Sequence, residues 1–134
     1  MASEKPFVLD TSALLALRGE EAGADEVEGL LRAAQSGECT LLASFMTRME
    51  LLYLIWREEG EQAARAALRL VDSFRVEWIS CEPGILDAAA AIKAGGGLSV
   101  ADCWIAATAL VCGAALVHKD PELKKLQALA QQWL

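Results

Sequence analysis

The sequence has little histidine and proline, no paired cysteines and no long apolar segment. It holds one histidine, His118, and three prolines, and its four cysteines form no Cys-X-X-Cys pair, so neither a zinc site nor a disulfide framework is expected. The longest uncharged run, 103–117, is shorter than the roughly 20 residues that span a bilayer. The first ten residues carry neither an apolar signal core nor an arginine-rich transit pattern. We therefore expect a soluble, cytoplasmic protein.

Positive charge is also scarce. Twelve Lys and Arg residues stand against nineteen Asp and Glu, which gives a net charge of −7 over 134 residues. Because 54% of the residues are hydrophobic and only 23% are charged, a disordered chain is excluded. The acidic balance argues against holding nucleic acid mainly by counterion release. It does not exclude a nuclease, since a bound divalent metal changes the local charge.

Short apolar runs alternate with segments of helical period along the whole chain. Strands are expected at 7–9, 39–43, 76–79, 114–117 and, as an edge strand, 131–134; helices are expected at 11–17, 22–35, 44–59, 61–73, 85–93 and 99–113, with a last short helix starting at Asp120-Pro121. This alternation predicts an α/β fold, a three-layer α/β/α sandwich with a parallel sheet of four to five strands. No linker or internal repeat interrupts it, so residues 1–134 are expected to form a single domain.

Four acids stand at or near the ends of these strands. Asp10 directly follows 7–9, and Asp120 lies three residues past 114–117. Asp102 lies one turn into the helix that Ser99 opens, and Glu50 about two turns into the helix at 44–59. Each has a plain structural explanation. Asp10 and Asp120 can cap helices, Ser99 and Asp102 resemble a capping box, and Glu50 can be a solvated helix residue.

Taken together, the acids indicate a metal site. Ligands of open parallel sheets bind beyond the carboxyl ends of the strands, and Asp10, Asp102 and Asp120 converge there if strands 7–9 and 114–117 are neighbours. Carboxylates within about 5 Å of one another repel, and a hard divalent cation resolves that conflict. Oxygen ligands suit Mg²⁺ or Mn²⁺. Glu50 joins the group because its helix is mostly apolar, where an unpaired carboxylate is costly.

Four segments resemble, in order, the four acidic motifs of the PIN domain, and most closely those of the VapC-type toxins of toxin–antitoxin pairs: FVLDTSALLAL, SFMTRMELLYL, LSVADCWIAATAL and ALVHKDPEL. The resemblance covers essentially the whole chain. In the fourth motif, His118 stands where the family usually has Thr or Ser, and Leu123 where an aromatic residue is common.

The resemblance implies a Mg²⁺- or Mn²⁺-dependent endoribonuclease that cleaves RNA as a toxin. Its implied metal ligands are Asp10, Asp102 and Asp120, with Glu50 acting through a water. Its implied supporting residues are Thr11, Ser12 and Ser99, and its candidate RNA contacts are Arg18, Arg48 and Lys119. The implied partners are RNA, a VapB-type antitoxin and a second copy of the chain in a homodimer, with no membrane.

Other interpretations remain open. The chain can be a PIN-fold RNA-processing nuclease without a toxin role, or a non-catalytic PIN-like binding module. A haloacid-dehalogenase-like phosphatase is disfavoured because it needs a second Asp where Ser12 stands, and a response-regulator receiver because Ser80 and Cys81 follow the third strand. We expect His118 at the surface of a strand end. The four tryptophans are expected in the core or an interface.

Overall fold

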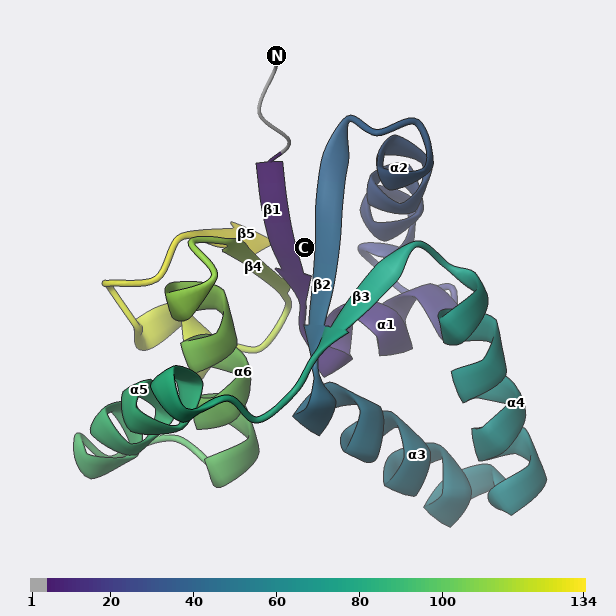
Figure 1. The fold of residues 1–134 in the computed structure, drawn as a ribbon. Coiled ribbons are helices and arrows are strands. Elements are labelled where there is room, and N and C mark those ends of the chain that lie inside the picture. Colours follow the sequence, from purple (N-terminus) through teal and green to yellow (C-terminus); the bar gives the residue numbers. More distant parts are fainter. Residues whose placement is uncertain (1–4) are drawn as a thin grey trace.

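A computed structural model describes residues 5–134, and its sheet contains five parallel strands (Figure 1). The strands are β1 (Lys5–Leu9), β2 (Cys39–Ser44), β3 (Val76–Ile79), β4 (Ala115–His118) and β5 (Gln131–Trp133). Their order is β3-β2-β1-β4-β5, so the chain builds outward from β1 to β3 and then returns to the other side of β1. Strand order therefore reverses between β1 and β4, which confirms that the strands carrying Asp10 and Asp120 are neighbours.

Six helices and one 3-10 turn connect the strands: α1 (Thr11–Arg18), α2 (Ala24–Gln35), α3 (Phe45–Glu59), α4 (Glu61–Ser73), α5 (Pro83–Ala94), α6 (Val100–Val111) and η1 (Leu123–Lys125). These bounds confirm the predicted helices with one exception. The short helix expected from Asp120-Pro121 forms only as the 3-10 turn Leu123–Lys125, which begins after a tight turn in which Asp120 Oδ1 accepts a hydrogen bond from Glu122 N. Leu126 then returns to extended backbone.

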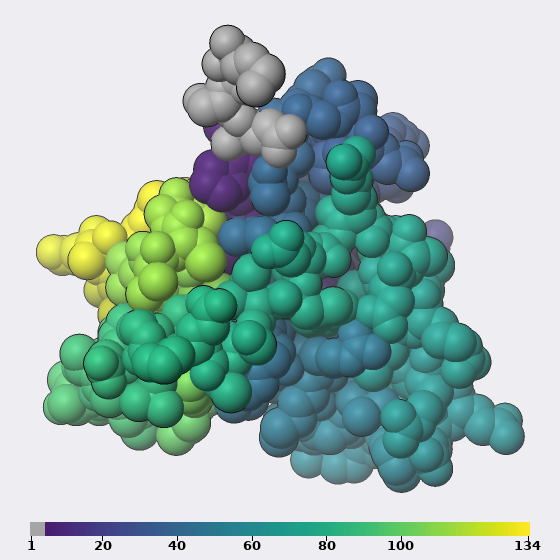
Figure 2. Space-filling model, in the orientation of Figure 1, coloured from purple at the N-terminus to yellow at the C-terminus, as the bar shows by residue number. Residues whose placement is uncertain are grey.

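The central strands are buried on both faces, as the three-layer prediction requires. Val8 and Leu9 follow each other in β1, yet Val8 packs in a core with Leu116 and helices α5 and α6, whereas Leu9 packs in a second core with Val117 and helices α1 to α4. Figure 1 shows α5 and α6 on one side of the sheet and α1, α2 and α4 on the other. In Figure 2 the segment from β3 to α5, coloured teal to green, runs across the middle of the face in view.

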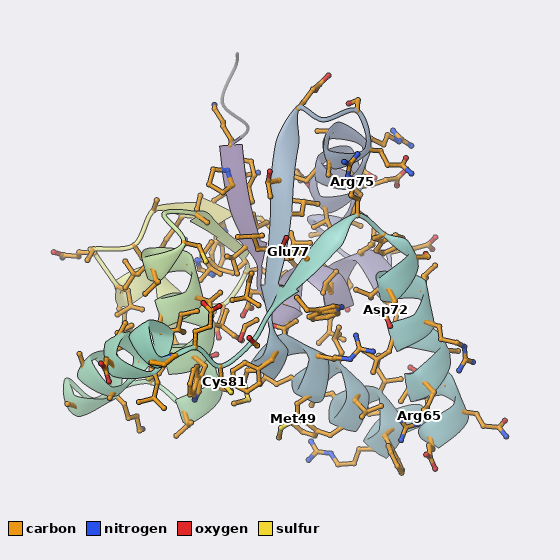
Figure 3. All side chains as sticks on the ribbon, in the orientation of Figure 1. Met49, Arg65, Asp72, Arg75, Glu77 and Cys81 are labelled. Atoms are coloured by element: carbon orange, nitrogen blue, oxygen red, sulfur yellow. The ribbon has the colours of Figure 1, made fainter. Side chains whose placement is uncertain are left out.

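Two local features hold the helices that bring acids to the strand ends. Helix α6 has three fully buried alanines, Ala106, Ala107 and Ala109. Their small side chains allow this helix to lie close to the sheet. On the other side, Asp72 points from α4 into the space beside β3 (Figure 3), where it accepts hydrogen bonds of 2.7 and 2.9 Å from Arg48 of α3, one to each carboxylate oxygen.

No helix within residues 5–134 combines the length and the hydrophobicity needed to cross a lipid bilayer.

Replacing Ile105 by alanine tests the core that seats α6 on the sheet. Ile105 is fully buried, so Ile105→Ala is expected to lower the free energy of unfolding by about 2–5 kcal/mol through lost transfer energy and a residual cavity. Val111→Ala in the same helix is the control, since Val111 is 50% exposed and its truncation should cost about 0.5 kcal/mol or less. Urea denaturation of both variants measures the difference; equal costs would contradict this packing.

Candidate active site

Asp10 lies at the point where strand order reverses, with only 3% of its surface exposed. It is the N-cap of α1: Oδ2 accepts hydrogen bonds from Ser12 N at 3.0 Å and from Ser12 Oγ at 2.5 Å. Ser12 Oγ also accepts a hydrogen bond of 3.1 Å from Lys119 N, beyond the end of β4. The structural explanation for Asp10 is therefore correct, and the same hydroxyl ties Asp10 to the segment that carries Asp120.

Glu50 reaches the same region from α3 and is held by hydroxyl groups. Thr11 Oγ1 donates a 2.7 Å hydrogen bond to Glu50 Oε1, and Thr47 Oγ1 lies 3.3 Å from Thr11 Oγ1. Thr47 is fully buried one turn before Glu50. Sequence reasoning missed it, although residues three apart share one helix face, so the Thr47-Arg48-Met49-Glu50 segment carried the signal. Glu50 is half-buried, which argues against a fully solvated role.

Asp102 and Asp120 approach from α6 and from the loop after β4. Ser99 is the N-cap of α6, and its Oγ accepts a hydrogen bond of 3.1 Å from Asp102 N, which fixes the first turn of that helix. Asp120 N donates a hydrogen bond of 3.1 Å to His118 Nδ1, two residues earlier. Both aspartates are half-buried.

The four carboxylates act on one another electrostatically. Burial and then the charges of Asp120, Asp10 and Glu50, in that order, raise the pKa of Asp102 from 3.8 to about 6, with an opposing contribution from Ser99. Burial also raises the pKa of Glu50, opposed by the Thr11 hydrogen bond and reinforced by Asp10 and Asp120. The four acids that the sequence grouped therefore lie within electrostatic reach of one another.

The pKa of Asp10 follows the same pattern. Burial raises this pKa above its usual value, against the hydrogen bonds from Ser12 and the nearby His118, while Asp120 raises it further. Among the residues that the structure describes, no lysine or arginine contributes to the pKa shift of Asp10, Glu50 or Asp102. The cluster is thus a concentration of negative charge whose hydrogen-bond partners include the hydroxyl groups of Thr11 and Ser12.

The donor set is all oxygen, which is the chemistry that a hard divalent cation prefers. Over residues 5–134, however, no three Asp, Glu, His or Cys side chains are grouped closely enough to form a ready ligand set. The carboxylate types therefore fit such an ion, and binding it requires them to draw together.

The candidate RNA-contacting cations are already engaged within the chain. Arg18 donates two hydrogen bonds to Glu59, at 2.5 and 3.1 Å, and Arg48 is paired with Asp72. Lys119 Nζ lies 3.3 Å from Glu21 Oε1 and donates to a backbone carbonyl at 3.0 Å. Contacts between these side chains and RNA remain predictions, and each would compete with an internal partner.

One expectation about ring side chains is wrong. His118 is fully buried, not at the surface, because β5 covers it with Gln131 and Trp133. Trp56 and Trp133 are 42% and 44% exposed, so for these two the expectation of a core or interface position is narrowed to an interface, which stays a prediction.

A groove of about 360 Å³ lies among α1, α2, α3 and α4. Its walls are mainly apolar and include Leu14, Leu17, Leu31, Leu51, Ile55 and Leu70. A separate exposed stripe on α3 consists of Met49, Tyr53 and Trp56, which recur at helical spacing.

Comparison with known proteins identifies related folds. The family model described as the PIN domain matches residues 7–129. The structure resembles VapBC2 of Rickettsia felis bound to a promoter DNA fragment (19% identity, 95% of this chain and 97% of that chain, TM-score 0.75) and DNA-bound VapBC of Salmonella typhimurium (20%, 97% and 98%, 0.75). It also resembles VapC20 of Mycobacterium tuberculosis, a toxin that cleaves the sarcin-ricin loop (19%, 90% and 95%, 0.70). No curated protein sequence matches.

Replacing Asp102 by asparagine tests the repulsion within the cluster. Because the folded-state pKa of Asp102 is raised to about 6, its contribution to stability is present below about pH 4 and is lost as the pH rises through 6. Asp102→Asn removes that loss, so the metal-free variant should gain more stability over the parent at pH 8 than at pH 5.

Urea denaturation in EDTA at both pH values measures this difference, with Asp87→Asn on the exposed face of α5 as the control. A variant that is less stable than the parent by the same amount at both pH values would show that Asp102 serves only the start of α6.

Proposed function

The chain belongs to the PIN domain family, and from this premise we propose that it is a divalent-metal-dependent endoribonuclease acting as the toxin of a toxin–antitoxin pair. The observation that carries this proposal is the cluster of four mutually repelling carboxylates at the β1–β4 reversal point. Asp10, Asp102 and Asp120 would hold Mg²⁺ or Mn²⁺, and Glu50 would reach the ion through a water.

The proposed role of each residue follows from its surroundings in the site. A bound divalent ion supplies Lewis acidity to a phosphate oxygen and to a water. Glu50, with a raised pKa and a hydrogen bond from Thr11, is suited to take a proton from that water. Ser12 orients the Asp10 carboxylate, and the Ser99 cap fixes the helix turn that presents Asp102. These supporting hydroxyls keep the acids in place while their charges repel.

The toxin role draws support from the similar structures, several of which are VapBC toxin–antitoxin complexes. A VapB-type antitoxin would lay an amphipathic segment in the apolar groove among α1 to α4 and place a basic side chain near the acids. The stripe of Met49, Tyr53 and Trp56 on α3 would serve a homodimer, because exposed aromatic side chains are typical of interface hot spots.

The two alternatives make different demands on the site. A non-catalytic binding module has no use for a group of carboxylates in which the pKa values of Asp10, Glu50 and Asp102 are raised. An RNA-processing nuclease without a toxin role would use the same acids and differ only in its substrate and in the absence of an antitoxin. RNA cleavage in vitro would exclude the binding module. Growth arrest on expression would exclude the RNA-processing nuclease without a toxin role.

Replacing single acids tests the catalytic assignment. Asp10→Asn keeps an acceptor for Ser12, and Glu50→Gln keeps one for Thr11, so both variants should fold while losing RNA cleavage by about 10²-fold or more. Cleavage of fluorescent RNA is measured with Mn²⁺, with Mg²⁺ and with EDTA, which should abolish it. Glu58→Gln, an exposed position on α3, should cleave as the parent does. A parent that binds RNA and never cleaves it would support the binding module.

Controlled expression in a bacterial host tests the toxin role. The parent should arrest growth and leave discrete new RNA ends, whereas Asp10→Asn at equal protein level should do neither, because it lacks the cleavage activity. Normal growth with a parent that cleaves RNA in vitro would favour the RNA-processing alternative.

A further inference from the structure

We propose that His118 and Gln131 form a positioning relay through which the edge strand β5 holds Asp120 in place within the carboxylate cluster. The inference rests on the proposed function, because it takes Asp120 as a metal ligand. His118 and Gln131 are positioning residues, since neither is placed among the acids themselves.

The relay is a chain of hydrogen bonds in which each donor and acceptor can be assigned. His118 Nδ1 accepts from Asp120 N at 3.1 Å, and a backbone N–H can only donate, so the ring proton is on Nε2. Nε2 therefore donates to Gln131 Oε1, 2.8 Å away. Gln131 Nε2 in turn donates to the carbonyl oxygen of Leu126 at 2.8 Å, which fixes the orientation of the amide. Each polar group of the relay between Leu126 and Asp120 therefore has a hydrogen-bond partner.

Packing keeps the imidazole in this orientation. The ring is fully buried and meets the Trp133 ring edge-on, with centroids 5.4 Å apart. The parallel pairing of β4 with β5 sets His118 opposite Trp133, and Leu134 N donates to the His118 carbonyl oxygen at 2.9 Å. Rotation of the ring would break both hydrogen bonds inside a packed environment, which is costly.

The relay and two further hydrogen bonds fix the position of Asp120. Its N–H is held by His118, the N–H of the preceding Lys119 is held by Ser12 Oγ, and its own Oδ1 accepts from Glu122 N at 3.0 Å. Within residues 5–134 the second carboxylate oxygen, Oδ2, accepts no hydrogen bond. The backbone is thus fixed from two sides, and one oxygen remains for an external ligand.

His118 makes the local hydrogen bond that a smaller polar residue could make and adds a second one to a distant strand. A Thr or Ser hydroxyl accepts the N–H two residues ahead in a local turn, and His118 Nδ1 makes that same contact. Imidazole has a second nitrogen, and here it bonds to Gln131 on another strand. A hydroxyl at position 118 would hold Asp120 without β5, whereas this chain makes the position of Asp120 depend on Gln131.

Gln131→Met tests this dependence, because methionine keeps the length of the side chain and removes both hydrogen bonds. Gln132→Met is the matched control on β5, since no hydrogen bond to the Gln132 side chain is found within residues 5–134. Two readouts are used: amide exchange of Asp120 N–H by NMR in EDTA, and the dissociation constant for Mn²⁺ by calorimetry. Gln131→Met should speed exchange and weaken Mn²⁺ binding about tenfold, the range found for partners of metal ligands.

A double-mutant cycle separates positioning from simple destabilisation. In a His118→Thr background the hydroxyl holds Asp120 locally, so adding Gln131→Met should change neither the exchange rate nor the Mn²⁺ affinity further. His118→Asn, whose Oδ1 can accept the same N–H, takes its place if the threonine variant does not fold. His118→Leu, which lacks an acceptor, should bind Mn²⁺ less tightly than either.

The outcomes distinguish this inference from the proposed function. If Gln131→Met matches Gln132→Met in exchange rate or in Mn²⁺ affinity while the parent binds Mn²⁺ and cleaves RNA, the relay is refuted and the nuclease stands. If the parent binds Mn²⁺ through a Gln131-dependent Asp120 but cleaves no RNA, the relay stands and the nuclease fails. A parent that binds no Mn²⁺ refutes both.

Discussion

Repulsion among four carboxylates is the constraint around which one end of this molecule is organised. The topology imposes it, because reversing strand order beside β1 brings Asp10 and Asp120 together and leaves α6 to deliver Asp102. Hydroxyl groups offset it without neutralising it: Ser12 donates to Asp10, and Thr11 to Glu50. A protein cation at the centre would stabilise the fold and would occupy the place that the proposed activity needs for a metal ion.

Much of this arrangement was accessible from the sequence, for identifiable reasons. Apolar runs flanked by turn residues marked the strands, and their alternation with helices fixed the parallel sheet, since such crossovers have few alternatives. Asp10 and Asp102 could be placed because each stands within four residues of a recognisable boundary. The grouping of the acids then followed from the general rule that ligands gather at the carboxyl ends of parallel strands.

What the sequence did not reveal depends on contacts between distant segments. No sequence pattern around His118 indicates that a three-residue strand at 131–133 buries it. An isolated histidine at a strand end is ordinarily exposed. Thr47 was missed because its role requires Thr11, which lies 36 positions earlier. The pairing of Arg18 with Glu59 likewise joins the ends of two helices that the pattern alone leaves unrelated.

Helix α1 belongs to two surfaces at once. Its first residue, Thr11, bonds to Glu50, and the next turns contribute Leu14 and Leu17 to the apolar groove. The helix has only eight residues, so the two surfaces lie within about two turns of each other. An uncharged small molecule bound in the groove would therefore contact the same short helix that carries the hydroxyl beside Glu50, without binding among the acids themselves.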